Sequence, residues 1–349
     1  MTLNLAFLTV GNPDRRTGGY LYHREVFRRW HAWGQPVDEI VLGPADVAGQ
    51  LAARAQVGRR IDPSRYDVLI IDALARVVVA PWIDSWRTYR PIVALIHELP
   101  TIAGANDLYE YEWERNLLRA DVLVTVSDEG AMALIERGAD PTRMYIASGG
   151  CDRLRNFIPT NLPRETLVIS VGQWIPRKNV AHLVRSWDQI APTTWRLELI
   201  GETDADPDYA TEVWQAIRHC SAPVIVRGVL PDDKLAECYA RASIFALPSR
   251  FEGYGLVFAE ALACGLPVVA GAVGPVPTLV GNGGILVPPD DEQALVNALR
   301  TVMADPLLRQ HLSEAAQQRA ASLPRWDETA QRLLTAVTNA FTGYTTQKT

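Results

Sequence analysis

The chain has 349 residues, a length that favours two domains over one. Its 40 acidic and 34 basic residues leave a formal net charge of −6, which excludes a protein that works mainly by neutralising nucleic-acid phosphates, so we expect no nucleic-acid partner. The length also excludes a small disulfide scaffold, and the 4 cysteines show no CxxC spacing, which indicates reduced thiols.

The amino terminus indicates neither export nor insertion into a membrane. Residues 1–10 lead directly into an apolar segment without a basic region before it, and no apolar run reaches the roughly 18 residues of a spanning helix. We therefore predict a cytoplasmic protein.

In the first half of the chain, short apolar runs alternate with segments of helical periodicity. The predicted strands are 3–10, 68–72, 92–97 and 122–127, and the predicted helices are 19–33 and 129–137. Such alternation is typical of βαβ units, in which a parallel sheet is covered on both faces. The first half therefore predicts a doubly wound α/β domain.

The alternation breaks after Ser148 into a polar stretch rich in turn residues, which predicts a linker at 152–165. It then restarts with strands at 167–171, 197–200, 224–226, 244–247 and 268–270, with helices at 180–190, 209–219, 232–241 and 256–264, and with final helices at 291–304, 306–321 and 326–341. We predict two doubly wound domains, 1–155 and 165–325, with the last helix, 326–342, joined to the first. Because ligands of such sheets bind at the carboxyl ends of the strands, a cleft between the two sheets is the expected site.

The loop after the strand at 244–247 carries the strongest chemical signal. Gly253 and Gly255 precede a helix that begins near Leu256, and backbone N–H groups at such a helix start bind phosphate. Glu252 in the loop and Glu260 in the helix offer carboxylates to sugar or ribose hydroxyls. The alternative is a loop in which glycine serves only the turn and both glutamates are surface residues.

The whole run at 252–269, EGYGLVFAEALACGLPVV, resembles the Glu-x7-Glu donor motif of glycosyltransferase family 4. The run at 171–179, VGQWIPRKN, is similar to that family's phosphate loop. Thr17-Gly18-Gly19, Ile96-His97, Gly150-Cys151-Asp152 and Val226-Arg227-Gly228-Val229 stand in the family's order along the chain. Many members carry Arg where this chain has Gln173, so a second cation on the diphosphate either comes from Arg177 or is absent.

The resemblance implies the GT-B fold, two Rossmann-like domains that face each other across a cleft. It implies that residues 1–155 bind the acceptor and residues 165–325 bind the nucleotide sugar. The implied catalytic residues are Lys178, Glu252, His97 and Arg177. The residues implied to hold the donor are Glu260, Gly253, Tyr254, Gly255, Leu256, Gly172, Gly228, Gly18 and Gly19.

Each of these assignments has a plainer alternative. Lys178 is one of three lysines, and it is either a phosphate ligand or a solvated lysine at a helix start. His97 ends a buried apolar run and either contacts a sugar hydroxyl or is a satisfied core histidine. Gly18 and Gly19 either approach the donor or form an ordinary helix-start turn.

Asp204-Ala205-Asp206 has the spacing of a metal-binding DxD pair. It lies in a run of turn residues after the strand at 197–200, which favours a solvated turn and helix cap. We therefore predict no metal site and no metal requirement.

The segment 20–33 mixes arginines with aromatic residues that include Tyr20 and Trp33. One interpretation is a helix that touches the inner face of an anionic membrane, and the other is a first helix packed on its own sheet with its arginines outward.

The resemblance implies a retaining transfer of a hexose from a UDP- or GDP-sugar to an acceptor hydroxyl of a glycan, a lipid or a small molecule. The acceptor would attack from the face that the diphosphate leaves, and no cofactor would be bound permanently. Two alternatives remain: a catalytically silent nucleotide-sugar-binding subunit and a GT-B-like nucleotide-sugar epimerase. A dehydrogenase is disfavoured because no GxGxxG motif follows the first strand.

Overall fold

The structure is a computed structural model that describes residues 2–159 and 162–348. The chain divides into two compact units. One contains the described residues up to Gly149 together with those from Trp326 onward, and the other spans Gly150–Arg325. Each unit is described by itself.

The first unit contains a six-stranded parallel sheet in the order β2-β1-β3-β4-β5-β6. Its strands are β1 (Leu5–Thr9), β2 (Val37–Val41), β3 (Val68–Asp72), β4 (Ile92–Ile96), β5 (Val122–Thr125) and β6 (Met144–Ile146). Every residue of β1, β3, β4 and β5 is buried, as expected for a parallel sheet covered on both faces.

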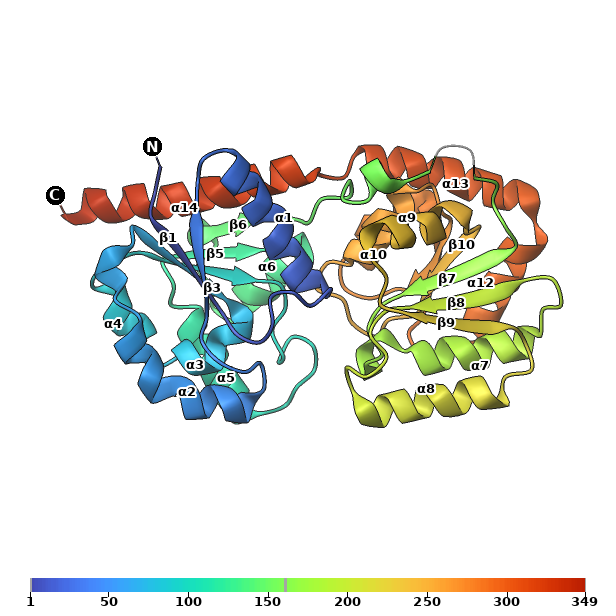
Figure 1. The fold of residues 1–349 in the computed structure, drawn as a ribbon, viewed down its shortest axis with the longest axis horizontal. Coiled ribbons are helices and arrows are strands. Elements are labelled where there is room, and N and C mark those ends of the chain that lie inside the picture. The colour runs from blue at the N-terminus through green and yellow to red at the C-terminus, as the bar shows by residue number, and fades with distance from the viewer. Residues whose placement is uncertain (1, 160–161, 349) are drawn as a thin grey trace. The chain divides into compact units, whose positions relative to one another are not determined.

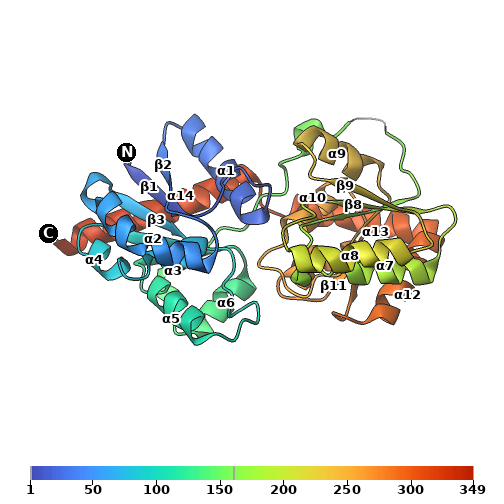
Figure 2. The ribbon, with the colours of Figure 1, turned by 60° about the horizontal axis from the view of Figure 1, so that its bottom comes forward.

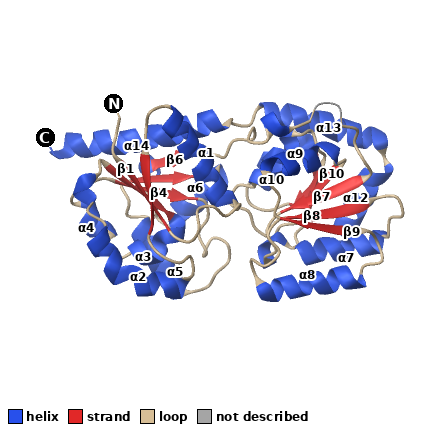
Figure 3. Ribbon diagram, viewed as in Figure 1, coloured by secondary structure: helices blue, strands red, loops and turns tan. Residues whose placement is uncertain are grey.

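Helices cover both faces of this sheet (Figures 1 and 3). They are α1 (Gly18–Ala32), α2 (Val47–Arg60), α3 (Arg76–Val79), α4 (Ile83–Arg87), α5 (Leu108–Leu117), α6 (Asp128–Glu136) and α14 (Trp326–Lys348), with short 3-10 turns at Pro63–Arg65, Ala73–Ala75 and Pro141–Arg143. The C-terminal helix α14 packs against α1 and the sheet, and Trp30 Nε1 donates to the Ala330 carbonyl at 2.9 Å.

The second unit contains another six-stranded parallel sheet, in the order β12-β11-β10-β7-β8-β9. Its strands are β7 (Leu167–Val171), β8 (Arg196–Ile200), β9 (Val224–Gly228), β10 (Ile244–Leu247), β11 (Val268–Gly271) and β12 (Gly284–Val287). The chain leaves β7 toward β8 on one side and leaves β10 toward β11 on the other. The strand order therefore reverses between the neighbours β7 and β10, and such reversals create the ligand crevice of a doubly wound sheet.

Helices also cover both faces of the second sheet (Figures 2 and 3). They are α7 (Val180–Ile190), α8 (Pro207–His219), α9 (Asp232–Arg241), α10 (Leu256–Ala263), α11 (Val276–Val280), α12 (Glu292–Ala304) and α13 (Pro306–Ala321), with 3-10 turns at Arg155–Phe157, Pro176–Lys178 and Gly281–Gly283. Separate apolar clusters lie on the two faces, one packed with α9, α10 and α11 and the other with α7, α8 and α12.

The structure confirms the two doubly wound sheets, and it corrects the prediction in detail. The sequence did not predict β2, β6, β12, α2 or α5, because β2, β6 and β12 are partly exposed edge strands without a continuous apolar run. The last helix continues to Lys348 rather than ending at 341 or 342, since its final residues are polar and leave no apolar periodicity to follow.

The aromatic segment 20–33 is a helix that buries its aromatic side. Tyr20, Tyr22 and Trp30 are buried in the first unit, whereas Trp33 is 44% exposed. The buried aromatic side agrees with the second interpretation. Of the arginines in this helix, Arg28 points outward with a 65% exposed side chain, whereas the Arg29 side chain is only 12% exposed. Contact with a membrane stays a prediction. Across the described residues, no helix combines the length and apolar character needed to cross a membrane.

Candidate active site

The loops after β7 and β10 meet at an ion pair. Lys178 ends the 3-10 turn Pro176–Lys178, and its Nζ lies 2.8 Å from both carboxylate oxygens of Glu252. The side chains of Lys178 and Glu252 are 12% and 4% exposed. The structure thus brings together two of the predicted catalytic residues, which are 74 residues apart in the sequence.

Further donors surround the Glu252 carboxylate. Ser249 Oγ donates to Glu252 Oε1 at 2.7 Å, and Arg177 Nη1 lies 4.0 Å from Oε2. Burial raises the pKa of Glu252. The charges of Lys178 and Arg177 and the hydrogen bonds from Lys178 and Ser249 together lower it by more than burial raises it, so the net pKa is below its ordinary value. Glu252 is therefore an ionised acceptor. The sequence analysis assigned no role to Ser249, which lies three residues before Glu252.

Backbone contacts hold the two loops in place. Arg250 N donates to the Arg177 carbonyl at 2.7 Å, and Gly172 N donates to the Ile200 carbonyl at 2.9 Å. Gly201 adopts a φ of +138°, and a Cβ there would lie 2.1 Å from the Gly172 oxygen. The backbone position of Gly172, a predicted phosphate-loop residue, therefore requires that residue 201 has no side chain.

We expect Gly201→Ala to destabilise the protein by about 1–2 kcal/mol more than Gly138→Ala, because only the former collides with backbone. Gly138 has a φ of +87° with nothing within 4 Å of a Cβ, so its variant isolates the cost of the backbone conformation. Chemical denaturation of both variants measures the difference, and equal stabilities would contradict the proposed packing of Gly172 on Gly201.

The predicted phosphate-binding glycine loop leads into α10. Gly255 is the N-cap residue of this helix and adopts a φ of +98°, a backbone conformation that residues with a side chain rarely adopt. Gly253 and Tyr254 precede it, and Leu256 is the first helical residue. The positive end of the α10 dipole therefore lies at this loop, directly after Glu252.

Glu260, on α10, is buried and has partners of its own. Its Oε1 accepts from Arg153 Nε at 2.8 Å and Nη2 at 2.7 Å, and its Oε2 lies 3.3 Å from the Tyr239 hydroxyl. Arg153 also contacts Asp232 at 2.8 Å. Burial lowers the pKa of Arg153, but the two carboxylates raise it to a net value above its ordinary one. The sequence analysis missed Arg153, although it directly follows the recognised Gly150-Cys151-Asp152.

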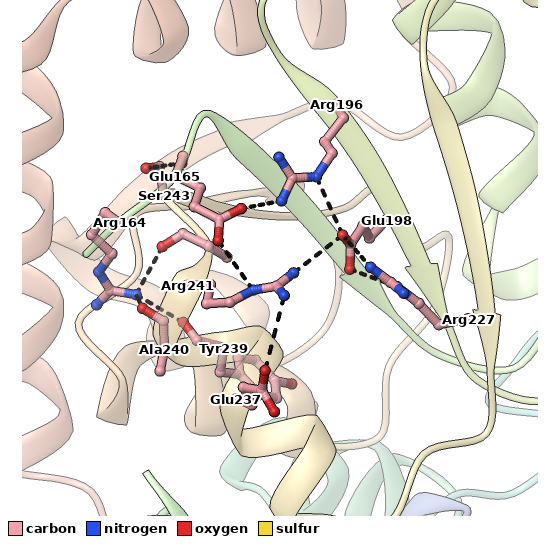
Figure 4. Close-up of polar contacts among 11 residues, drawn as sticks. Arg164, Glu165, Arg196, Glu198, Arg227, Glu237, Tyr239, Ala240, Arg241 and Ser243 are labelled. Carbon is pink, nitrogen blue, oxygen red and sulfur yellow. Dashed lines mark hydrogen bonds and ion pairs between the residues drawn. The ribbon is translucent and has the colours of Figure 1, made fainter. Parts of the chain in front are cut away.

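Gly228 ends β9 with a φ of +65°, and a Cβ at this position would meet nothing within 4 Å. The neighbouring Arg227 side chain turns to Glu198, a fully buried carboxylate on β8 (Figure 4). Arg196 and Arg241 reach the same carboxylate at 3.3 Å. Burial raises the pKa of Glu198, and the Arg227 contacts lower it to a net value below the ordinary one. Gly228 can contact the donor only through its backbone atoms, and this contact stays a prediction.

The remaining predicted residues lie in the first unit. Gly18 and Gly19 begin α1, and a Cβ on Gly19 would lie 3.5 Å from the His97 ring. His97 follows β4, and its Nε2 lies 2.8 Å from Nε2 of His23, a residue of α1 that the sequence analysis did not single out. Gly19 and His97 are thus close together, and one nitrogen of His97 has a protein partner.

A buried polar chain continues from His23. His23 Nδ1 lies 4.0 Å from Asp72 Oδ2, which accepts from the Thr9 hydroxyl at 2.7 Å. Burial lowers the pKa of His23 to about 3, and burial with the neighbouring His23 lowers that of His97 to about 3. Burial also raises the pKa of Asp72. Both imidazoles are therefore neutral near pH 7.

The depressed pKa of His23 predicts a loss of stability on acidification. The unfolded chain binds a proton at His23 near pH 6.5, while the folded protein binds it only near pH 3. The free energy of unfolding therefore decreases as the pH is lowered from 6.5 toward 3. We expect a contribution of about 1.4 kcal/mol per pH unit below pH ~6.5. Chemical denaturation between pH ~7 and ~5 measures the slope, which His23→Gln should reduce and which the matched change of the exposed His219→Gln should leave intact.

Asp206, in the run with DxD spacing, is the N-cap of α8, as the sequence predicted, and its carboxylate accepts from Tyr209 N at 3.0 Å. Within 2–159 and 162–348, no group of three or more His, Cys, Asp and Glu side chains is arranged to hold a metal ion. The expected independence of metal stays a prediction.

Comparisons with known proteins identify relatives of the chain. Residues 165–305 match the family described as "Glycosyl transferases group 1". A D-inositol 3-phosphate glycosyltransferase of Thermomonospora curvata is 31% identical over 88% of this chain and 81% of the relative. An alpha-maltose-1-phosphate synthase of Mycolicibacterium smegmatis is 32% identical over 62% of this chain, which spans 59% of that relative.

Solved structures share the fold. A sucrose-phosphate synthase from Thermosynechococcus elongatus has a TM-score of 0.79 at 24% identity, covering 97% of this chain and 99% of that one. Anabaena HepE in complex with UDP-glucose has a TM-score of 0.79 at 20% identity, covering 97% and 100% of the respective chains.

Proposed function

The chain belongs to the group 1 glycosyltransferases and has the GT-B fold of two Rossmann-like domains, and from this premise we propose that it transfers a hexose from a UDP- or GDP-sugar to an acceptor hydroxyl with retention of configuration. In this proposal Gly150–Arg325 binds the donor, and the first unit, with His97, Gly18 and Gly19, binds the acceptor and the sugar.

The observation that carries the proposal is the Lys178–Glu252 pair beside the glycine loop and the amino end of α10. In this proposal the Lys178 ammonium, which has three N–H donors, also donates to a diphosphate oxygen and places its positive charge on the leaving group. Glu252 accepts three hydrogen bonds from Lys178 and Ser249 and, with about four lone-pair sites, keeps capacity for a sugar hydroxyl. Arg177 supplies the second cation that Gln173 does not provide, since Gln173 Nε2 donates to Glu202 at 2.6 Å.

These groups support a front-face reaction. The acceptor oxygen forms a bond to the anomeric carbon from the side on which the bond to the β-phosphate oxygen breaks, and the departing phosphate takes the acceptor proton. Negative charge develops on the diphosphate as it leaves. Lys178, Arg177 and the N–H groups at Gly253–Gly255 are fixed before that charge appears, so they stabilise the transition state without reorganisation.

The acceptor is proposed to be a hydroxyl of a glycan, a lipid or a small molecule. Several relatives carry the name D-inositol 3-phosphate glycosyltransferase, one of them aligned over 88% of this chain. This supports D-inositol 3-phosphate as the first acceptor to assay.

Thermal shift with UDP- and GDP-sugars identifies the donor, and NMR of the product anomeric centre then tests retention. We expect stabilisation by one nucleotide sugar and a product with the donor's anomeric configuration, with the same rate in the presence of a chelator. Binding without transfer or donor hydrolysis would favour a silent binding subunit. Isomerisation of the sugar without an acceptor would favour an epimerase, and an inverted product would contradict the front-face proposal.

A further inference from the structure

We propose that Arg153 is a positioning residue that holds the Glu260 carboxylate for recognition of the donor ribose. This inference rests on the proposed function, in which Glu260 accepts hydrogen bonds from the ribose hydroxyls of the nucleotide. Arg153 acts through Glu260 and is not itself assigned a contact with the donor.

The geometry of the pair is asymmetric. Both Arg153 contacts, Nε at 2.8 Å and Nη2 at 2.7 Å, go to Oε1 of Glu260. The other oxygen, Oε2, lies 3.3 Å from the Tyr239 hydroxyl, which lies equally far from the Val257 carbonyl. A tyrosine hydroxyl has one proton to donate, so Oε2 keeps acceptor capacity. Two ribose hydroxyls are the kind of donor pair that such an oxygen can accept.

Arg153 is itself fixed from a second side. Its Nη1 donates to Asp232 in the first turn of α9 at 2.8 Å, and the Arg153 side chain is 4% exposed. The guanidinium therefore links α9 to α10 and cannot turn away from Glu260 without breaking both contacts. Planar, multiply bonded guanidinium groups hold a carboxylate in one orientation, which a single ammonium does less well.

The charges also favour a role beyond stability. The largely buried Arg153 guanidinium lies between two carboxylates, those of Glu260 and Asp232. Buried ion pairs are commonly no more stabilising than apolar residues of similar volume. Stability therefore does not by itself account for these buried charges, whereas orientation of the Glu260 carboxylate toward hydroxyl donors does.

The test is calorimetry with UDP and GDP and with their 2′,3′-dideoxy forms, which lack both ribose hydroxyls. The wild-type protein should bind its ribonucleotide more tightly than the dideoxy form. In Arg153→Met we expect ribonucleotide affinity to fall by about 10–100-fold, to the level of the dideoxy form, while dideoxy affinity stays unchanged. Arg153→Lys, which restores the charge but not the planar fork, should recover part of the difference.

A double-mutant cycle tests whether Arg153 acts through Glu260. Arg153→Met added to Glu260→Gln should cost no further ribonucleotide affinity, and this double variant leaves no unpaired charge at position 260, so it remains measurable if Arg153→Met folds poorly. The matched control is Arg241→Met. Arg241 is ion-paired to Glu165 and Glu198 elsewhere in the same unit, and its loss should leave the discrimination between the two nucleotide forms intact.

Equal losses for ribonucleotide and dideoxy form in Arg153→Met would show a merely structural arginine and overturn the inference, as would discrimination that survives the change. A wild-type protein that binds ribonucleotide and dideoxy form equally would remove Glu260 from the ribose and the inference with it. A wild-type protein that binds none of the four nucleotides would instead contradict the proposed function.

Discussion

Lys178→Met should lower turnover by about 10²–10³-fold at saturating donor, while nucleotide affinity falls much less. The Lys178 ammonium lies 2.8 Å from Glu252 at the reversal point of the second sheet, beside the amino end of α10. Its charge contributes most when the diphosphate departs, because only then does full negative charge appear on the leaving group. The measurement is kcat with the donor that thermal shift identifies, together with calorimetry of the nucleoside diphosphate.

The same change leaves the buried Glu252 without its nearest cation. Removing one partner of a buried ion pair destabilises a protein by about 3–5 kcal/mol, so kcat has to be measured on protein shown to be folded. Adding Glu252→Gln to Lys178→Met removes the unpaired carboxylate charge at position 252 and so limits the loss of stability. Lys178→Arg keeps a positive charge at position 178. The control is Lys234→Met, an exposed lysine on α9 whose loss should leave turnover intact. Normal turnover in folded Lys178→Met would contradict the assignment of the phosphate loop.

Glu260→Ala should weaken binding of UDP or GDP by about 1.5–3 kcal/mol, because the ribose hydroxyls lose a charge-assisted acceptor. The stability cost is moderated by Asp232, which remains paired with Arg153 at 2.8 Å in the variant. Calorimetry of the wild type and the variant gives the difference.

Glu237→Ala is the matched control for this change, since Glu237 is a partly exposed glutamate that pairs with Lys234 on α9. The Glu237→Ala variant should bind the nucleotide with the same affinity as the wild type. If Glu260→Ala also bound both nucleotides like the wild type, Glu260 would have no place in the donor site.

The amino-acid sequence was sufficient for the family and for the framework of the fold. The alternation of apolar runs with helical segments predicted the two parallel sheets, because buried strands such as β3 and β7 are short continuous apolar runs whose pattern needs no tertiary context. The run at 252–269 and the run at 171–179 predicted Glu252, Glu260 and Lys178, and the comparisons confirm the glycosyltransferase family that these runs resemble.

The sequence did not determine which polar side chains pair with each other. Arg153 and Glu260 are 107 residues apart, and His23 and His97 are 74 apart, so neither pair lies within the range over which periodicity or a motif relates two side chains. Edge strands such as β2 escaped prediction for a related reason, since their exposure removes the apolar pattern and only hydrogen bonds to a neighbouring strand define them.

The tertiary structure decided these features because parallel strands gather the loops that follow them at one edge of a sheet. The reversal of strand order between β7 and β10 brings Lys178 to Glu252. The adjacency of β1, β3 and β4 likewise collects Thr9, Asp72 and His97 around His23. Local sequence determines where a strand ends, whereas the partner of the residue at that end is set by long-range packing.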